Sequence, residues 1–155
     1  TADGFAAALN AFIAQNYGAG RNDRVRKGYK ASLWTVGIWG LLISAVFICV
    51  PEPIARIFFH EPAAIATAVE YLIIIGFSEA FMCVELTTVG ALSGLGRTRL
   101  CSIISIAFTS ARIPLAIILG GIMGLNGIWW ALSSTSIVKG IIFTCTFLWI
   151  TRKRK

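Results

Sequence analysis

The stretch from Ala63 to Thr98 constrains this chain most, because it is a long apolar run that carries three carboxylates, Glu70, Glu79 and Glu85. As one α-helix the run is roughly 48 Å long, which exceeds the hydrocarbon core of a bilayer, about 30 Å thick. A globular core needs no helix of that length. The stretch therefore predicts a membrane-spanning helix that tilts or flexes, with Gly76 as the expected point of flexure.

The composition agrees with an integral membrane protein. Hydrophobic residues make up 57% of the chain and charged residues only 14%, whereas soluble proteins have about 25% charged residues. The net charge of +7 could suggest nucleic acid, but the bases lie beside apolar stretches rather than on a polar face. We therefore expect a lipid bilayer around the chain and no nucleic-acid partner.

The apolar pattern predicts an all-α integral membrane fold with four complete transmembrane helices and the tail of a fifth. The stretch from Ala31 to Val50 has about twenty residues without a charge, the length of one span. The expected spans are residues 1–17 (partial), 31–50, 63–94, 100–119 and 128–150. Gly18–Lys30 is predicted to be a loop, residues 51–62 a connection with a short interfacial helix, and Gly120–Gly127 a turn. Because the chain opens without Met and partway along a helix, we expect residues 1–155 to be part of a longer protein.

The distribution of bases predicts the orientation. Eleven of the 14 Lys and Arg residues fall in the Gly18–Lys30 loop, around Arg97 or in the tail from Arg152, all on one side of this topology. Cytoplasmic loops of membrane proteins are rich in Lys and Arg. The pattern thus favours a multi-pass protein of the cytoplasmic (inner) membrane with its C-terminus in the cytoplasm.

Ionisable side chains inside spans are costly and commonly belong to substrate or ion paths. Measured from the cytoplasmic ends, Glu79 lies about 22 Å deep, Arg112 about 20 Å, Lys139 about 18 Å and Glu85 about 13 Å. These depths predict the pairs Glu79–Arg112 and Glu85–Lys139. Such a carboxylate could exchange its base for a proton or a cation; alternatively, the pairs are static and only hold helices together.

Three other features have weaker implications. Gly90-x-x-x-Gly94 and Gly120-x-x-x-Gly124 match a motif of close helix contact. His60 and four scattered cysteines lack metal-ligand spacing, so no metal site is expected from them. No hydrolytic nucleophile with a base and no phosphate-binding loop is present in the sequence, so the chain is not expected to be an enzyme.

Four motifs along the chain carry a family resemblance: Gln15-Asn16-Tyr17-Gly18-Ala19-Gly20, Gly94-Leu95-Gly96-Arg97-Thr98, Arg112-Ile113-Pro114-Leu115 and Gly124-Leu125-Asn126-Gly127-Ile128-Trp129. In this order and topology they resemble the multidrug and toxic compound extrusion (MATE) family of antiporters. The resemblance implies twelve helices in two lobes, of which this chain is similar to a partial C-terminal lobe. The N-terminal lobe of the same protein would then be its partner.

The resemblance also implies a function: secondary active efflux of cationic drugs in exchange for H⁺ or Na⁺, with no cofactor besides the coupling ion. Candidate ion- or substrate-binding residues are Glu79, Glu85, Arg112, Lys139, Asn10, Gln15 and Asp3, with possible Na⁺ binding at Glu79 or Glu85. Two alternatives stay open. One is a lipid-linked oligosaccharide flippase of the same superfamily, in which Arg112 and Lys139 contact an anionic headgroup, and the other is a structural membrane subunit.

Overall fold

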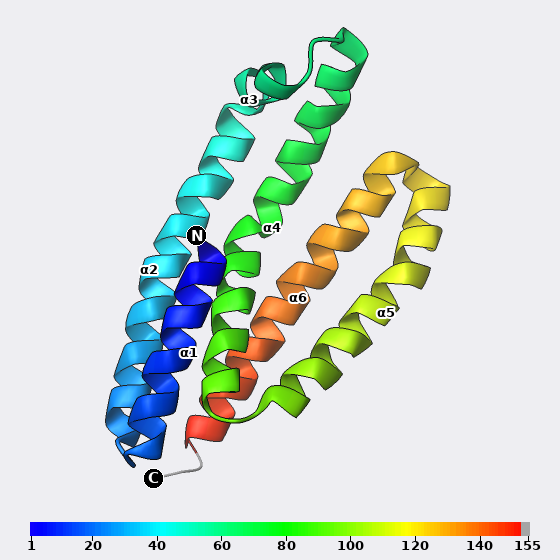
Figure 1. Ribbon diagram of the computed structural model, residues 1–155. Helices are drawn as coiled ribbons and strands as arrows, with labels where there is room; N and C mark the ends of the chain where they lie inside the picture. Colours follow the sequence, from blue (N-terminus) through cyan, green and yellow to red (C-terminus); the bar gives the residue numbers. More distant parts are fainter. Residues whose placement is uncertain (153–155) are drawn as a thin grey trace.

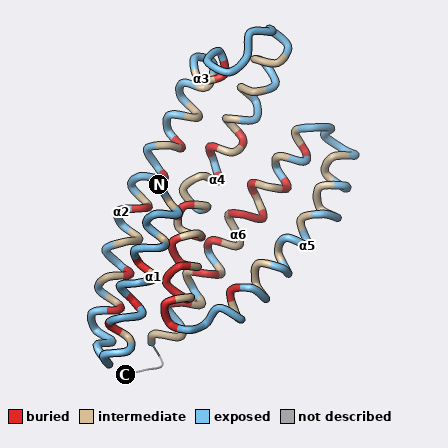
Figure 2. The backbone as a smooth tube through the Cα atoms, viewed as in Figure 1, coloured by how far each residue is buried: buried red, intermediate tan, exposed pale blue. Residues whose placement is uncertain are grey.

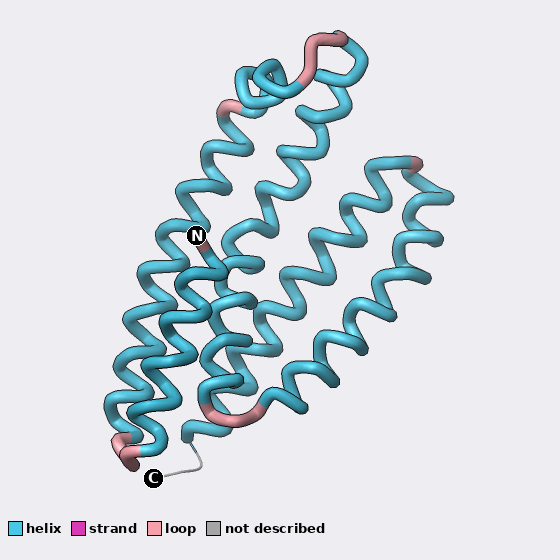
Figure 3. Tube along the Cα trace, in the orientation of Figure 1, coloured by secondary structure: helices cyan, strands magenta, loops and turns pink. Residues whose placement is uncertain are grey.

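The computed structural model describes residues 1–152, and this part of the chain is helical apart from short connections (Figures 1 and 3). The helices are α1 (Ala2–Gly18), α2 (Asn22–Cys49), α3 (Pro51–Phe58), α4 (Pro62–Gly94), α5 (Thr98–Met123) and α6 (Leu125–Arg152). The helices α2, α4, α5 and α6 are each long and apolar enough to cross a membrane. The predicted all-α membrane fold with four complete spans is confirmed.

Helix α4 lies at the centre of the bundle (Figure 1). It packs against α1, α2, α3 and α6, whereas α5 packs mainly against α6 at the edge. The chain reverses direction between α1 and α2, across α3, and on either side of α5, so α1, α4 and α6 run the same way along the bundle. The parallel packing of α4 and α6 brings together residues about sixty positions apart.

The structure corrects two predicted connections. The loop expected at Gly18–Lys30 is wrong, because α2 begins at Asn22 and so includes Lys30. Asp23 lies in the first turn of α2. Its negative carboxylate is attracted to the positive N-terminal end of the helix dipole, which helps the helix extend beyond the apolar span. The turn expected at Gly120–Gly127 is also shorter, because Gly124 alone separates α5 from α6 and adopts a φ of 63° that glycine accommodates without strain.

Helix α4 is continuous across Gly76, so the flexure proposed there stays a prediction. Gly76 instead allows α4 to pack closely against α2, because a Cβ added to it would lie 2.9 Å from Ile48 on α2. The membrane boundaries of the five predicted spans likewise remain predictions, since the helices extend beyond several of them.

Basic side chains gather at one end of the bundle, which we call the basic end. It comprises the connection between α1 and α2, the connection between α4 and α5, and the end of α6 (Figure 1). Its described bases are Arg21, Arg24, Arg26, Lys27, Lys30, Arg97, Arg99 and Arg152. The opposite end carries Arg56, which pairs with Glu52 within the exposed helix α3. The tail bases Lys153, Arg154 and Lys155, which the sequence assigns to the basic end, lie outside the described residues.

Buried residues concentrate where α4 meets α1, α2 and α6 (Figure 2). Tyr29 of α2 is 1% exposed, stacks on Phe147 of α6 at a ring distance of 3.7 Å and lies 2.9 Å from the hydroxyl of Thr88 on α4. The Thr88 hydroxyl donates to the carbonyl of Val84, so the Tyr29 hydroxyl is the donor between them. Tyr29 thereby joins three helices near the basic end.

Glycines allow α1 and α4 to approach closely. Gly90 lies against the backbone of Ala6, and a Cβ on Gly94 would lie 2.6 Å from the carbonyl oxygen of Asn10. Backbones meet this closely in membranes because small residues at helix interfaces increase van der Waals contact. The Gly90-x-x-x-Gly94 motif is therefore a helix contact, whereas Gly124 of the second motif lies in the turn.

This contact yields a stability prediction. Gly90→Ala in the full-length protein should destabilise the fold by about 1–3 kcal/mol, because the added methyl group overlaps the backbone of α1. Gly37→Ala is the matched control, since Gly37 is also helical and its Cβ would meet open space; it should be neutral or stabilise by up to about 1 kcal/mol. Thermal unfolding in detergent measures both, and equal midpoints for the two variants would refute the close-contact argument.

Candidate functional site

The centre of the candidate site is an ion pair between α4 and α6. Lys139 Nζ lies 2.7 Å from Glu85 Oε1, and each side chain is 12% exposed. The Lys139 ammonium also lies 5.9 Å from the centre of the Phe143 ring, within reach of a cation–π interaction. The predicted Glu85–Lys139 pair is therefore present, at a depth where an unpaired charge is costly.

Local packing explains why these two side chains meet. Ser133 of α6 donates to the carbonyl of Ile74 on α4 at 2.8 Å, and a Cβ on Gly140 would lie 2.8 Å from the carbonyl oxygen of Phe81. From the first contact to the second, the residue number increases by seven on α6 and by seven on α4, which is two helical turns. This register fixes α6 against α4 and places Lys139 level with Ala80, so its long side chain extends along the helices to reach Glu85.

Arg112 of α5 reaches the same region by a different route. Its Nε donates to Thr135 Oγ1 at 2.9 Å and its Nη2 donates to Ser136 Oγ at 3.3 Å. Thr135 in turn donates its hydroxyl hydrogen to carbonyls in its own helix, Ala131 among them at 2.7 Å. The guanidinium is thus held by neutral hydroxyl oxygens, and among the described residues no carboxylate lies within ion-pair distance of it.

The predicted Glu79–Arg112 pair is therefore wrong. Glu79 lies six residues before Glu85, which turns its side chain about 120° away around α4, and it instead accepts a long contact of 3.8 Å from the thiol of Cys83. Glu79 and Arg112 lie at similar depths along the bundle, but the Glu79 side chain leaves α4 in a direction that does not face Arg112. Glu70, the third acid of the run, is exposed near the start of α4.

The ion pair and Arg112 line one cavity of about 170 Å³. Its wall is formed by Glu85, Arg112, Lys139 and Ser136 together with apolar side chains of α4 and α6: Ile75, Met82, Leu86 and Leu132. Arg112 and Leu132 also line a neighbouring apolar hollow between α5 and α6. The arrangement combines apolar walls with a few converging polar groups, as ligand sites usually do.

The remaining sequence candidates lie elsewhere. Asp3, Asn10 and Gln15 are on α1, which contacts α4 at Gly90 and Gly94, and none of the three lines this cavity. Asp3 and Gln15 are exposed, and Asn10 is half-buried. The structure thus brings together Glu85, Lys139 and Arg112, and leaves Glu79 and the α1 residues apart from them.

Sequence reasoning missed the hydroxyls that hold Arg112. The signal was present as the run Ser133-Ser134-Thr135-Ser136 within an apolar span. Consecutive hydroxyl residues in a span can bond to their own helix carbonyls, so the run alone gives no partner across helices. Only the packing of α5 against α6 identifies Thr135 and Ser136 as the acceptors for the Arg112 guanidinium.

With Glu85 and Lys139 ionised, the cavity holds one negative and two positive side chains. Protonation of Glu85, or a cation in place of the Lys139 ammonium, would remove the attraction that joins α4 to α6 here. The site can therefore link occupancy of a carboxylate to the packing of α4 against α6.

Comparisons with known proteins agree with this arrangement. A model of the MatE family matches residues 2–118. A probable multidrug resistance protein NorM of Thermotoga maritima is 28% identical over 152 residues, which cover 94% of this chain and 32% of that protein. A NorM of Pseudomonas aeruginosa is 28% identical over 149 residues (91% and 30%), and multidrug and toxin extrusion protein 1 of Danio rerio is 25% identical over 147 residues (90% and 24%).

The chain spans about a third of the length of the curated relatives it matches. The family model covers most of the chain, including α1 to α4 and most of α5. The resemblance drawn from the four sequence motifs is confirmed, and the chain belongs to the MatE family of multidrug and toxic compound extrusion proteins.

Proposed function

We propose that this chain is part of a secondary transporter that exports organic cations or similar drugs in exchange for inward H⁺ or Na⁺. The observation that carries the proposal is the Glu85–Lys139 ion pair on the wall of the cavity. The names of the relatives, multidrug resistance and multidrug extrusion proteins, support the substrate class. Family members that act as transporters have no catalytic chemistry of their own, so we propose no enzyme activity.

In this mechanism Glu85 is the coupling residue. Its carboxylate is stabilised by Lys139, and the arriving H⁺ or Na⁺ replaces that ammonium. Lys139 then becomes a free positive charge beside Arg112, which disfavours a cationic substrate in the same cavity. Ion entry thereby promotes substrate release, as antiport requires.

We further propose that the basic end faces the cytoplasm and that the chain lies in the cytoplasmic membrane. Eight described bases at this end, against Arg56 at the other, fit the excess of Lys and Arg in cytoplasmic loops. Ions entering the cell would then approach Glu85 from the end that carries α3.

The coupling role predicts unequal effects of two similar substitutions. In the full-length protein, Glu85→Gln should reduce ion-driven efflux of a fluorescent cation from vesicles at least about tenfold, because the amide cannot take up the coupling ion. Glu79→Gln, the matched control on the same helix, should keep most of the activity, since Glu79 lies away from the cavity.

A folding control separates coupling from stability. Replacing one member of a buried pair costs about 3–5 kcal/mol, whereas replacing both with neutral side chains is often tolerated. The double variant Glu85→Gln/Lys139→Met should therefore recover the thermal midpoint lost by Glu85→Gln and still lack ion-driven efflux. Full efflux by the double variant would show that the pair is only structural.

A second candidate function is a flippase for a lipid-linked oligosaccharide, and the hydroxyl-bound Arg112 favours it. Two cations against one carboxylate leave the cavity able to receive an anionic headgroup. In a host carrying the full-length gene, antiport predicts drug resistance that Glu85→Gln abolishes, with surface polysaccharide unchanged. Loss of surface polysaccharide in Arg112→Gln cells that retain drug resistance would instead support the flippase.

The residues 1–155 alone should not transport. The family resemblance implies a cavity between two lobes, and alternating access moves one lobe against the other around it. The purified segment in vesicles should therefore show no ion-driven cation uptake above that of empty vesicles. Uptake comparable to the full-length protein would overturn the two-lobe mechanism.

A further inference from the structure

A second pocket lies away from the ion pair, between α2 and α6 at the basic end. Its volume is about 210 Å³, and its lining contains three bases, Arg26, Lys30 and Arg152, but no acid. Among the described residues the recorded ion pairs join only Arg56 to Glu52 and Lys139 to Glu85, so none of these three bases is neutralised by a carboxylate. Two helices thus direct positive charge into one hollow.

The rest of this pocket is apolar. Tyr29 and Phe147 form its buried floor, and Leu148 at its rim is 45% exposed. Next along α6 is Trp149, a residue type enriched at the boundary between hydrocarbon and headgroups. The pocket therefore combines a cationic part and an apolar part at the depth where a phospholipid changes from headgroup to acyl chain.

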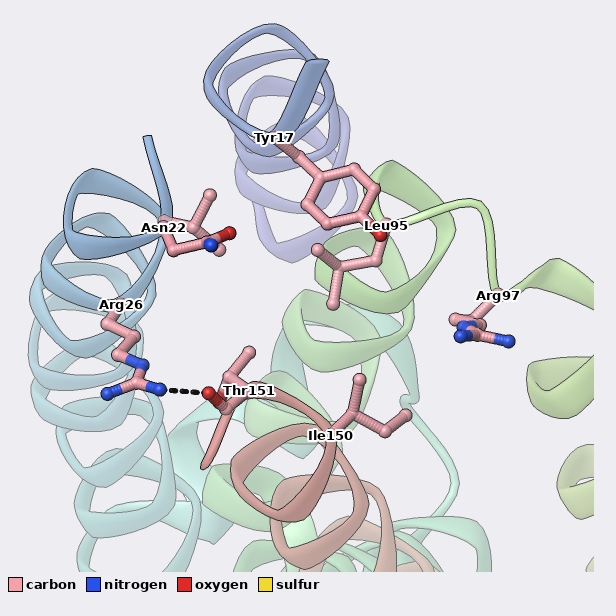
Figure 4. Close-up of a pocket in the computed structure, with 8 residues that line it drawn as sticks. Tyr17, Asn22, Arg26, Leu95, Arg97, Ile150 and Thr151 are labelled. Carbon is pink, nitrogen blue, oxygen red and sulfur yellow. Dashed lines mark hydrogen bonds between the residues drawn. The ribbon is translucent and has the colours of Figure 1, made fainter. Parts of the chain in front are cut away.

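Arg26 is fixed in place at the edge of the pocket. Its guanidinium donates to the backbone carbonyl of Thr151 in the last turn of α6. Figure 4 shows Arg26 directed at Thr151, with Asn22 on the same helix and Tyr17, Leu95 and Arg97 across the neighbouring hollow. Lys30 and Arg152, both exposed, remain available to a ligand.

We propose that this pocket binds an anionic phospholipid, whose phosphate contacts Lys30, Arg152 and the remaining N–H groups of Arg26, and whose acyl chain lies along the exposed Leu148. Basic pockets between membrane helices on the cytoplasmic side bind anionic headgroups by this combination of charge and apolar contact. The lipid would join the start of α2 to the end of α6 and stabilise the basic end. This site is independent of the coupling role of Glu85.

Native mass spectrometry of the full-length protein tests the proposal. Phosphatidylglycerol should remain bound in preference to phosphatidylcholine with the same acyl chains. Lys30→Gln/Arg152→Gln should lower the phosphatidylglycerol affinity about twentyfold, and each single variant about fivefold. The matched control, Lys27→Gln/Arg99→Gln, removes two bases of the basic end that do not line the pocket and should keep the affinity within about twofold of the wild type.

Four outcomes would overturn the proposal. Equal loss of lipid in the two double variants would reveal a general charge effect, and equal retention of both lipids by the wild type would reveal no headgroup preference. Complete displacement of phosphatidylglycerol by millimolar inorganic phosphate would show a simple anion site without acyl contact. A structure of the full-length protein with another helix seated between α2 and α6 would assign the pocket to that helix instead.

Discussion

The hydrocarbon interior of a bilayer offers no hydrogen-bond partner, and this constraint accounts for most of the polar contacts in the bundle. Glu85 meets Lys139, Tyr29 donates to Thr88, and Arg112 donates to Thr135. Each contact joins two different helices, so the need to satisfy a polar group also fixes how the helices lie. Helix α4 takes part in two of these contacts, which is consistent with its central position (Figure 1).

Close approach is the second requirement, because apolar helices gain little from leaving lipid for each other. Small residues meet it where α4 contacts its neighbours: Gly90 and Gly94 face α1, and Gly40 of α2 lies against Ala80. The packing register that results is also what aligns the ion pair. The candidate site is thus a product of the same contacts that stabilise the helix bundle, and changes in one are expected to affect the other.

The two charged regions of the molecule have different characters. The Glu85–Lys139 pair is nearly buried and coupled to helix packing, which suits the coupling role proposed for Glu85. The bases of the basic end are mostly exposed and lie beside apolar side chains, which suits a lasting contact with headgroups. Arg112 belongs to neither type. Its charge is held by hydroxyls of α6, and this excess positive charge is the feature that keeps an anionic substrate in consideration.

Depth along a helix predicted two ion pairs alike, and only Glu85–Lys139 is present. The sequence by itself determined the fold class, the four spans and the family, because apolar length and motif order are linear properties of the chain. It did not determine that Glu79 faces away from Arg112, or that Thr135 and Ser136 hold the guanidinium. Those outcomes depend on the rotation of each helix about its own axis, which packing at Gly140, Ser133 and similar contacts sets only when the helices meet. Likewise, helix propensity beyond the apolar stretch extended α2 to Asn22, a boundary that hydropathy cannot give. The convergence of Lys30 and Arg152 on one pocket was also decided only by tertiary structure, since the two residues come from helices at opposite ends of the chain.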